Sequence, residues 1–393
     1  MLLFMVYATG RTFLDADSHL MELPDFLQRY ADPSARSVVP WLSLSSGGHM
    51  ADQFDQFLET RGHAPDVVDE LRSLGDGLIA GPKNYEALGA FNADERVDAL
   101  DLLGFHRQLV FATFSAEGVF STDARVATAS ATAHNRGLAD FCGRDPRLLA
   151  VGATSLDDPA QACRELEHII ELDMAAVWVP HRPAGGRSPG HNDLDPFWSR
   201  AAEAGIAVAL HVGGDNLQLE PEWMNTGRPQ PTDWLGGAEN VRGKDMISLH
   251  HAAEKFVGTM VLDGVLERHP ELRVVVVELG AGWVPDMIAR LDHSVEIWSR
   301  SEPELAALER KPSEQIAAQM AFTPFVFEDV GSMIRATGPE LYLFSSDYPH
   351  AEGGRNPLGR FGRSLESFDT DVLDKFYQGN FERTVPASAA RRP

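Results

Sequence analysis

The chain has 393 residues, of which 44% are hydrophobic and 23% charged, and its 58 acidic and 34 basic side chains give a net charge of −24 at pH 7. Such an acidic surface repels nucleic acid and anionic lipid, so the expected partner is a small molecule. No stretch approaches the roughly 20 apolar residues that cross a bilayer. The apolar opening MLLFMVY lacks the features of a signal peptide, and two cysteines fit a reducing cytoplasm.

Short apolar runs alternate with helical patterns along the chain, which is typical of an α/β protein built on a parallel sheet. Runs such as IAVAL and RVVVVEL are apolar on both faces, as expected for strands buried on both sides. The expected strands are residues 12–17, 108–114, 148–156, 175–180, 207–213, 273–279, 321–325 and 340–346. Eight strands separated by helices predict a closed (β/α)8 TIM barrel, a single domain over residues 1–393, with an open doubly wound sheet as the alternative.

The helical patterns between these runs carry recognisable boundary signals. Asn92 is expected to cap a helix that ends at Gly104, since asparagine is favoured at helix starts and glycine at helix ends. Further helices are expected over residues 129–142, 159–172, 195–204 and 254–269.

One segment breaks the alternation of strands and helices. Residues 21–91 directly follow the first strand and are rich in Gly, Ser, Pro and Asp. Loops that follow the strands of a barrel lie on its active-site face. The segment is therefore predicted to be an insertion that forms part of a lid, with a peripheral decoration as the alternative.

Side chains that can bind a metal follow four of the expected strands. They are Asp17 and His19 after the first strand, His211 after the fifth, Glu278 after the sixth and Asp347 after the eighth. The carboxyl ends of barrel strands meet at one face, so these side chains are expected to converge. Two imidazoles and two carboxylates suit Zn²⁺ or Mn²⁺. The sequence therefore predicts one divalent ion bound by Asp17, His19, His211 and Asp347.

Two acidic residues near this set have other expected roles. Asp15 alternates onto the same side as Asp17 but lies deeper in the barrel, where a structural hydrogen-bonding role is expected. Glu278 is expected either to act as a general acid or base or to hold a ligand histidine through a hydrogen bond.

The motifs LDADSHLMEL, GVLERHPELRVVVVELGAGWVP and SSDYPH, in this order, resemble those of the amidohydrolase superfamily. The resemblance is to its amidohydrolase-2 branch, which includes aminocarboxymuconate-semialdehyde decarboxylase and related aromatic-acid decarboxylases, and it covers nearly the entire chain. It implies the same metal ligands and a homodimer. Asp17 departs from the usual histidine of the family, which favours a harder ion such as Mn²⁺. Glu278 also stands where the well-studied decarboxylases have a histidine.

The resemblance favours a metal-dependent carboxy-lyase that decarboxylates a small aromatic or muconate-like acid without oxidation. Metal-dependent hydrolysis of an ester, amide or lactone is the alternative, and a non-catalytic binding barrel is a third hypothesis. Asp347, Glu278 and His211 are the expected catalytic residues. Asp347 is expected to supply a proton to the ring carbon in decarboxylation, or to receive one from water in hydrolysis.

Four further residues are expected to contact the substrate from the active-site face. Arg182 follows the fourth strand and is suited to pair with a substrate carboxylate. His181 precedes it, His350 closes the SDYPH motif, and His251 lies in the long segment after the fifth strand.

Overall fold

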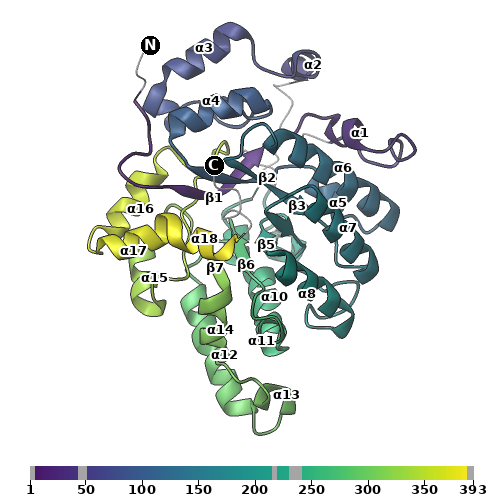
Figure 1. Ribbon diagram of the computed structural model, residues 1–393, viewed down its shortest axis with the longest axis vertical. Helices are drawn as coiled ribbons and strands as arrows, with labels where there is room; N and C mark the ends of the chain where they lie inside the picture. Colours follow the sequence, from purple (N-terminus) through teal and green to yellow (C-terminus); the bar gives the residue numbers. More distant parts are fainter. Residues whose placement is uncertain (1–4, 43–50, 215–218, 230–240, 387–393) are drawn as a thin grey trace.

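The structure is a computed structural model that describes residues 5–42, 51–214, 219–229 and 241–386. Seven parallel strands form one curved sheet whose order follows the chain, and helices surround it (Figure 1). Seven of the eight predicted strands are confirmed in this way. They are β1 (Leu14–Leu20), β2 (Arg107–Ala112), β3 (Leu148–Ala153), β4 (Ala176–Trp178), β5 (Ala207–His211), β6 (Val274–Val277) and β7 (Met320–Phe322).

The eighth predicted strand is an extended segment that hydrogen-bonds to both edges of the sheet without forming a regular strand. On the β7 side, Phe322 N donates to Leu341 O at 2.8 Å, and Leu343 N donates to Phe322 O at 2.9 Å. On the β1 side, Ala16 N donates to Phe344 O at 3.0 Å. We call residues 341–348 the closing segment, because it joins β7 to β1 and completes the predicted (β/α)8 barrel.

The buried carboxylate of Asp15 fastens the closing segment to β1 and β2. It accepts hydrogen bonds from Ser346 N at 2.8 Å, from Ser346 Oγ at 2.6 Å and from Gln108 Nε2 at 2.8 Å. Burial raises the pKa of Asp15 to about 7, although these hydrogen bonds act in the opposite direction. The structural role predicted for Asp15 is thus the closure of the barrel wall.

The helices lie outside the barrel and largely match the predicted ones (Figure 1). Asn92 Oδ1 accepts a hydrogen bond from Glu95 N at 3.0 Å at the start of α4, and Gly104 ends that helix with a φ of 73°. The helix predicted over 254–269 is two helices, because Gly264 adopts a φ of 72° between them. The helices from α4 to α11 are α4 (Ala93–Leu103), α5 (Ala116–Val119), α6 (Ala124–Cys142), α7 (Pro159–Glu171), η3 (Asn192–Leu194), α8 (Asp195–Ala204), α9 (Pro221–Met224), η4 (Asp245–Ile247), α10 (His251–Leu262) and α11 (Val265–Arg268).

The remaining helices follow β6 and β7. One group, α12 with α13 and α14, projects from the barrel at the lower end of Figure 1. The elements are α12 (Val284–Trp298), α13 (Pro303–Ala306), α14 (Pro312–Gln319), α15 (Val330–Thr337), α16 (Pro357–Leu365), α17 (Thr370–Asp374), η5 (Lys375–Gly379) and α18 (Asn380–Thr384). Within the described ranges, no helix is long and apolar enough to span a membrane.

The insertion predicted at residues 21–91 is a group of short helices. They are α1 (Phe26–Tyr30), α2 (Ala51–Thr60), α3 (Pro65–Ser73), η1 (Gly75–Ala80) and η2 (Asn84–Glu86), and residues 43–50 lie outside the described part. Helix α1 packs closely on α6, since a Cβ at Gly137 would lie 2.3 Å from the ring of Phe26. At the other end of the insertion, Asn84 N donates to Pro349 O at 2.9 Å. The insertion therefore reaches the loop that follows the closing segment.

We expect Asp15→Ala to lower the free energy of unfolding by roughly 3 kcal/mol, because four buried donors lose their acceptor. Asp15→Asn retains one carbonyl oxygen and should lose less. Urea unfolding monitored by circular dichroism measures both variants. An alanine variant as stable as the wild type would contradict this role.

Candidate active site

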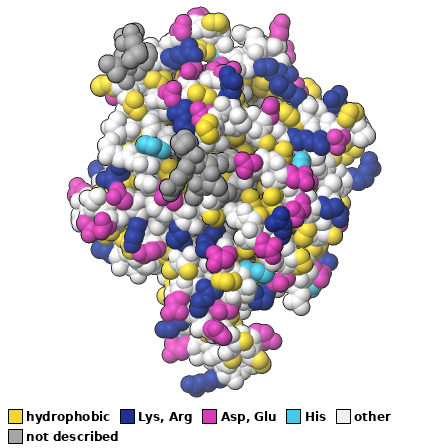
Figure 2. All heavy atoms as spheres, viewed as in Figure 1, with side chains coloured by type: hydrophobic (Ala, Val, Ile, Leu, Met, Phe, Trp, Pro, Cys, Tyr) yellow, Lys and Arg dark blue, Asp and Glu magenta, His cyan; other side chains and the backbone are white. Residues whose placement is uncertain are grey.

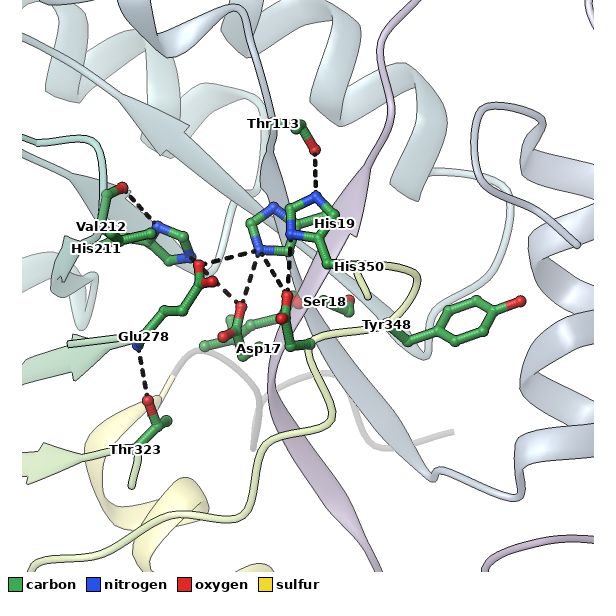
Figure 3. Close-up of polar contacts among 12 residues, drawn as sticks. Asp17, Ser18, His19, Thr113, His211, Val212, Glu278, Thr323, Tyr348 and His350 are labelled. Carbon is green, nitrogen blue, oxygen red and sulfur yellow. Dashed lines mark hydrogen bonds and ion pairs between the residues drawn. The ribbon is translucent and has the colours of Figure 1, made fainter. Parts of the chain in front are cut away.

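Six predicted residues from four parts of the chain converge at the carboxyl end of the barrel (Figure 3). Potential ligand atoms lie within 4.8 Å of one another in two overlapping groups. The first group comprises Asp17, His19, His211 and Glu278, and the second comprises His19, Glu278, Asp347 and His350. Three predicted ligands, Asp17, His19 and His211, share the first group with Glu278. The fourth, Asp347, shares only the second group with His19.

His19 lies at the centre of this cluster. Its Nε2 atom is 3.2 Å from Asp17 Oδ1, 3.5 Å from Asp347 Oδ1 and 3.8 Å from Glu278 Oε2. His211 Nε2 lies 3.4 Å from both Asp17 Oδ1 and Glu278 Oε2. All these side chains are buried or nearly so, which makes the cluster a compact set of nitrogen and oxygen donors shielded from water.

Backbone contacts fix the orientation of the donors that follow β5 and β6. The Nδ1 atom of His211 lies 2.9 Å from Val212 O. A carbonyl oxygen only accepts, so Nδ1 carries a proton, and Nε2 faces the carboxylates. Glu278 N donates to Thr323 Oγ1 at 2.9 Å, and Glu278 adopts a φ of 56°. Asp347 has a similar φ of 54°, so both carboxylates stand on left-handed backbone.

Burial and neighbouring charges shift the pKa values of the acids and histidines in this site. Burial raises the pKa of Asp17, but the interactions of its carboxylate with the imidazoles of His19 and His211 outweigh burial and hold the pKa well below its usual range. Burial, followed by the charge of His350, lowers the pKa of His19 to about 3, so this imidazole is neutral. Burial also raises the pKa of Asp347 to about 6.

This donor set fits a divalent metal ion. Neutral imidazoles and carboxylates are the forms that bind metals. Both ring nitrogens of His19 and the Oδ1 atom of Asp347 are buried and have no hydrogen-bond partner in the described part of the chain. Buried polar atoms are normally satisfied, so a cation among them would supply the missing interactions.

His350 links the cluster to a network of hydrogen bonds outside it. Its Nδ1 lies 3.1 Å from Asp347 Oδ1 and its Nε2 lies 3.0 Å from Thr113 Oγ1, while its ring stacks on His19 with centroids 3.9 Å apart. Thr113 Oγ1 donates its single proton to Leu20 O at 2.9 Å. It must therefore accept from His350 Nε2, while His350 Nδ1 faces Asp347 Oδ1.

Glu22 was missed by the sequence analysis and holds this network in place. Its buried carboxylate accepts from the backbone nitrogens of Thr113 at 2.8 Å and Ser115 at 2.9 Å, and from Ser115 Oγ at 2.5 Å. The loop after β2 is thereby fixed with Thr113 beside His350. The only sequence signal was an acidic residue shortly after the first metal-ligand motif.

Arg96 is a second residue that the sequence analysis missed. It is fully buried in α4, and its guanidinium donates to the carbonyl oxygens of Gly89 and His19. It also lies over the ring of Tyr348, which in Figure 3 points away from the cluster. Arg96 therefore positions the backbone of His19, one of the predicted metal ligands.

The other predicted substrate contacts lie in different surroundings. His181 is buried with both ring nitrogens lacking a hydrogen-bond partner within the described residues, and burial, followed by the charge of His211, lowers its pKa to about 3. Arg182 donates to Asp157 Oδ2 at 2.8 Å and to Phe120 O at 3.2 Å, so both terminal nitrogens of its guanidinium are already engaged. His251 is exposed at the start of α10 and lines a groove of about 810 Å³ beside α12. The structure does not bring His251 into the cluster.

Comparison with known proteins identifies the family of this chain and supports its fold. A family model described as Amidohydrolase matches residues 48–386, a range that begins after Asp17 and His19. Decarboxylase orsB of Emericella nidulans is 22% identical over 302 residues, which cover 77% of this chain and 82% of that protein. The amidohydrolase map2389c of Mycobacterium avium subsp. paratuberculosis K-10 has a TM-score of 0.72 at 22% identity, with 96% of this chain and 100% of that chain covered.

A third similar protein was solved with ligands. It is a 5-carboxyvanillate decarboxylase from Novosphingobium aromaticivorans DSM 12444 in complex with manganese and 4-hydroxy-3-methoxy-5-nitrobenzoic acid. Its TM-score is 0.63 at 16% identity, and 98% of each chain is covered. At these identities the structural likeness establishes a shared fold.

Metal binding to the metal-free protein should release a proton below pH 6, because the pKa of Asp347 is raised to about 6 and the metal displaces its proton. Mn²⁺ affinity should then fall by at most about tenfold per pH unit as the pH decreases below 6, since one proton competes. His19 stays neutral across this range because its pKa is about 3. Calorimetry in two buffers of different ionisation enthalpy counts the protons. Equal affinity at pH 5 and pH 7 would contradict the prediction.

Proposed function

The chain belongs to the amidohydrolase family, and we propose that it is a metal-dependent carboxy-lyase that removes carbon dioxide from a small hydroxylated aromatic or muconate-like acid. The observation that carries the proposal is the contact between Asp347 and His350 inside a buried set of metal-binding side chains. This arrangement provides both a metal site and a proton source beside it. The two similar proteins named as decarboxylases, one of them acting on 5-carboxyvanillate, support the same reaction.

Asp17, His19, His211 and Asp347 would hold one divalent ion. When bound, the ion withdraws electron density from the carboxylate and the neighbouring oxygen of the substrate. The two aspartates, with Glu278 beside them, make the donor set rich in oxygen, which favours Mn²⁺ over Zn²⁺. Manganese in the similar 5-carboxyvanillate decarboxylase supports this choice.

The reaction requires one proton at the ring carbon. The bond between that carbon and the carboxylate breaks, its electron pair stays on the ring, and the carbon takes a proton as carbon dioxide leaves. We assign delivery of this proton to the pair of Asp347 and His350, whose Oδ1 and Nδ1 atoms lie 3.1 Å apart, and with the metal bound the pair takes the proton from solvent in each turnover. Thr113 orients His350 for this task through the hydrogen bond to Nε2.

Glu278 and His181 complete the proposed site. Glu278 Oε2 lies 3.4 Å from His211 Nε2 and 3.8 Å from His19 Nε2. Its negative charge strengthens both imidazoles as metal ligands, and its position keeps the carboxylate within reach of the reacting atoms. His181 is neutral and buried, so it offers the substrate one hydrogen-bond donor and one acceptor. A side chain on Gly214 would lie 2.6 Å from His181 Nδ1, so the loop after β5 holds this ring closely.

Two features of the whole molecule complete the proposal. Neither Cys142 nor Cys163 forms a disulfide in the structure, in keeping with a cytoplasmic enzyme. Acidic and basic side chains are mixed among the described residues on the face in Figure 2. We further propose that the enzyme is a homodimer that acts on a small molecule.

The Mn²⁺-loaded enzyme is expected to release carbon dioxide from one or more hydroxybenzoates and to leave aryl esters and lactones intact. A panel assay that measures carbon dioxide and ester cleavage in parallel tests this. Metal removal by a chelator should abolish the activity, and added Mn²⁺ should restore it. Ester or lactone cleavage without carbon dioxide release would identify a hydrolase instead.

Glu278→Gln is expected to retain the metal and to lower kcat by about 10²-fold or more, because it keeps the shape but loses the negative charge beside the imidazoles. Asp347→Asn should lose both metal and activity, since it removes a ligand and the partner of His350. Elemental analysis and steady-state kinetics separate the two effects. Loss of metal from Glu278→Gln would show that Glu278 is itself a ligand.

A further inference from the structure

The charge of the proposed site leaves the binding of an anionic substrate unexplained. Asp17, Glu278 and Asp347 bring three carboxylates together, and one divalent ion balances two of their charges. An acid that enters this site adds a further negative charge. If the proposed reaction is correct, the substrate therefore needs a cation from the protein in addition to the metal.

Two buried or half-buried arginines near the site are already engaged. Arg182 forms an ion pair with Asp157 and donates to the carbonyl of Phe120. Arg96 donates through Nε and Nη2 to the carbonyl oxygens of Gly89 and His19, and these two bonds hold its guanidinium in place although its buried Nη1 atom has no hydrogen-bond partner among the described residues. Neither guanidinium can turn toward a substrate without breaking these hydrogen bonds.

Lys83 is differently placed. Its Nζ atom is buried and has no hydrogen-bond partner anywhere in the described ranges. It lies 5.7 Å from the ring centroid of Tyr348, in the closing segment, and its charge interacts favourably with Asp347 and Glu352 and unfavourably with Arg355. Burial lowers the pKa of Lys83 to about 8, so the side chain remains mostly a cation at pH 7. An unpartnered buried ammonium group costs free energy, which a bound anion would recover.

The backbone holds this lysine rigidly beside the loop that carries His350. Asn84 N donates to Pro349 O at 2.9 Å, and Ala87 N donates to Asn84 O at 3.1 Å. Asn84 Oδ1 is also buried without a hydrogen-bond partner among the residues described. A donor and an acceptor therefore stand unused on adjacent residues at the start of η2, and together they match an acid that also carries a hydroxyl group.

We propose that Lys83 binds an anionic oxygen of the substrate, so that the insertion after β1 supplies a specificity-determining residue of the active site. The inference rests on the proposed function, but it concerns binding, which can be measured without turnover. It assigns to Lys83 the carboxylate-pairing role that the sequence analysis gave to Arg182.

The test compares salicylate with salicylamide, which differ in charge but share the ring and its hydroxyl group. Dissociation constants for the Mn²⁺-loaded enzyme at pH 7 are measured by calorimetry. Lys83→Met should raise the constant for salicylate by about tenfold or more, the loss of one charge-assisted hydrogen bond. It should change that for salicylamide by less than about twofold. Lys83→Arg should keep most of the affinity for salicylate.

Lys255→Met is the matched control, because Lys255 is an exposed lysine on α10. It should change neither constant. Equal losses for the two compounds in Lys83→Met would mean a structural role and would overturn the proposal. So would unchanged constants, or a wild type that binds salicylate no more tightly than salicylamide. If Lys83 gives charge-selective binding but the enzyme releases carbon dioxide from no hydroxybenzoate of the panel, this inference stands and the proposed reaction is refuted.

Discussion

The hydrogen bonds of one buried carboxylate hold the two ends of the barrel wall together. Asp15 accepts from Gln108 on β2 and from both the backbone and the hydroxyl of Ser346 in the closing segment. Asp17 lies two residues beyond Asp15, and Asp347 directly follows Ser346. The closure of the barrel therefore aligns Asp17 and Asp347, two predicted metal ligands from opposite ends of the chain. A backbone hydrogen bond from Asp347 N to Asp17 O at 2.9 Å joins them directly.

The close packing of the carboxylates in the active-site cluster is electrostatically unfavourable while no cation is bound. Asp17, Glu278 and Asp347 lie close together in surroundings that exclude water, and burial raises the pKa of Asp347. A ligand that binds only the folded state stabilises it. Metal binding should therefore contribute to the stability of the fold as well as to chemistry, which ties the integrity of the barrel to the supply of the ion.

The sequence allowed residues at the ends of strands to be predicted, but it did not predict contacts between loops. His19, His211 and Asp347 could be predicted because the carboxyl ends of parallel strands share one face, whatever the details of the loops. Arg182 is different, since its engagement by Asp157 depends on the path of another loop. Likewise, no periodicity indicated that His251 begins a helix and faces solvent. Lys83 was missed because an isolated lysine in a polar insertion has no pattern that reveals its burial.

The backbone at Glu278 has a consequence for how such sites diversify. Its φ of 56° lies where glycine, asparagine, aspartate and histidine are tolerated and β-branched residues are strongly disfavoured. The position therefore admits an exchange between an acid and an imidazole without remodelling of β6, whereas a drift toward valine or isoleucine would strain the loop. The backbone at this position thus excludes β-branched side chains but accepts aspartate or histidine, so the chemistry of the barrel can change there while its architecture stays the same.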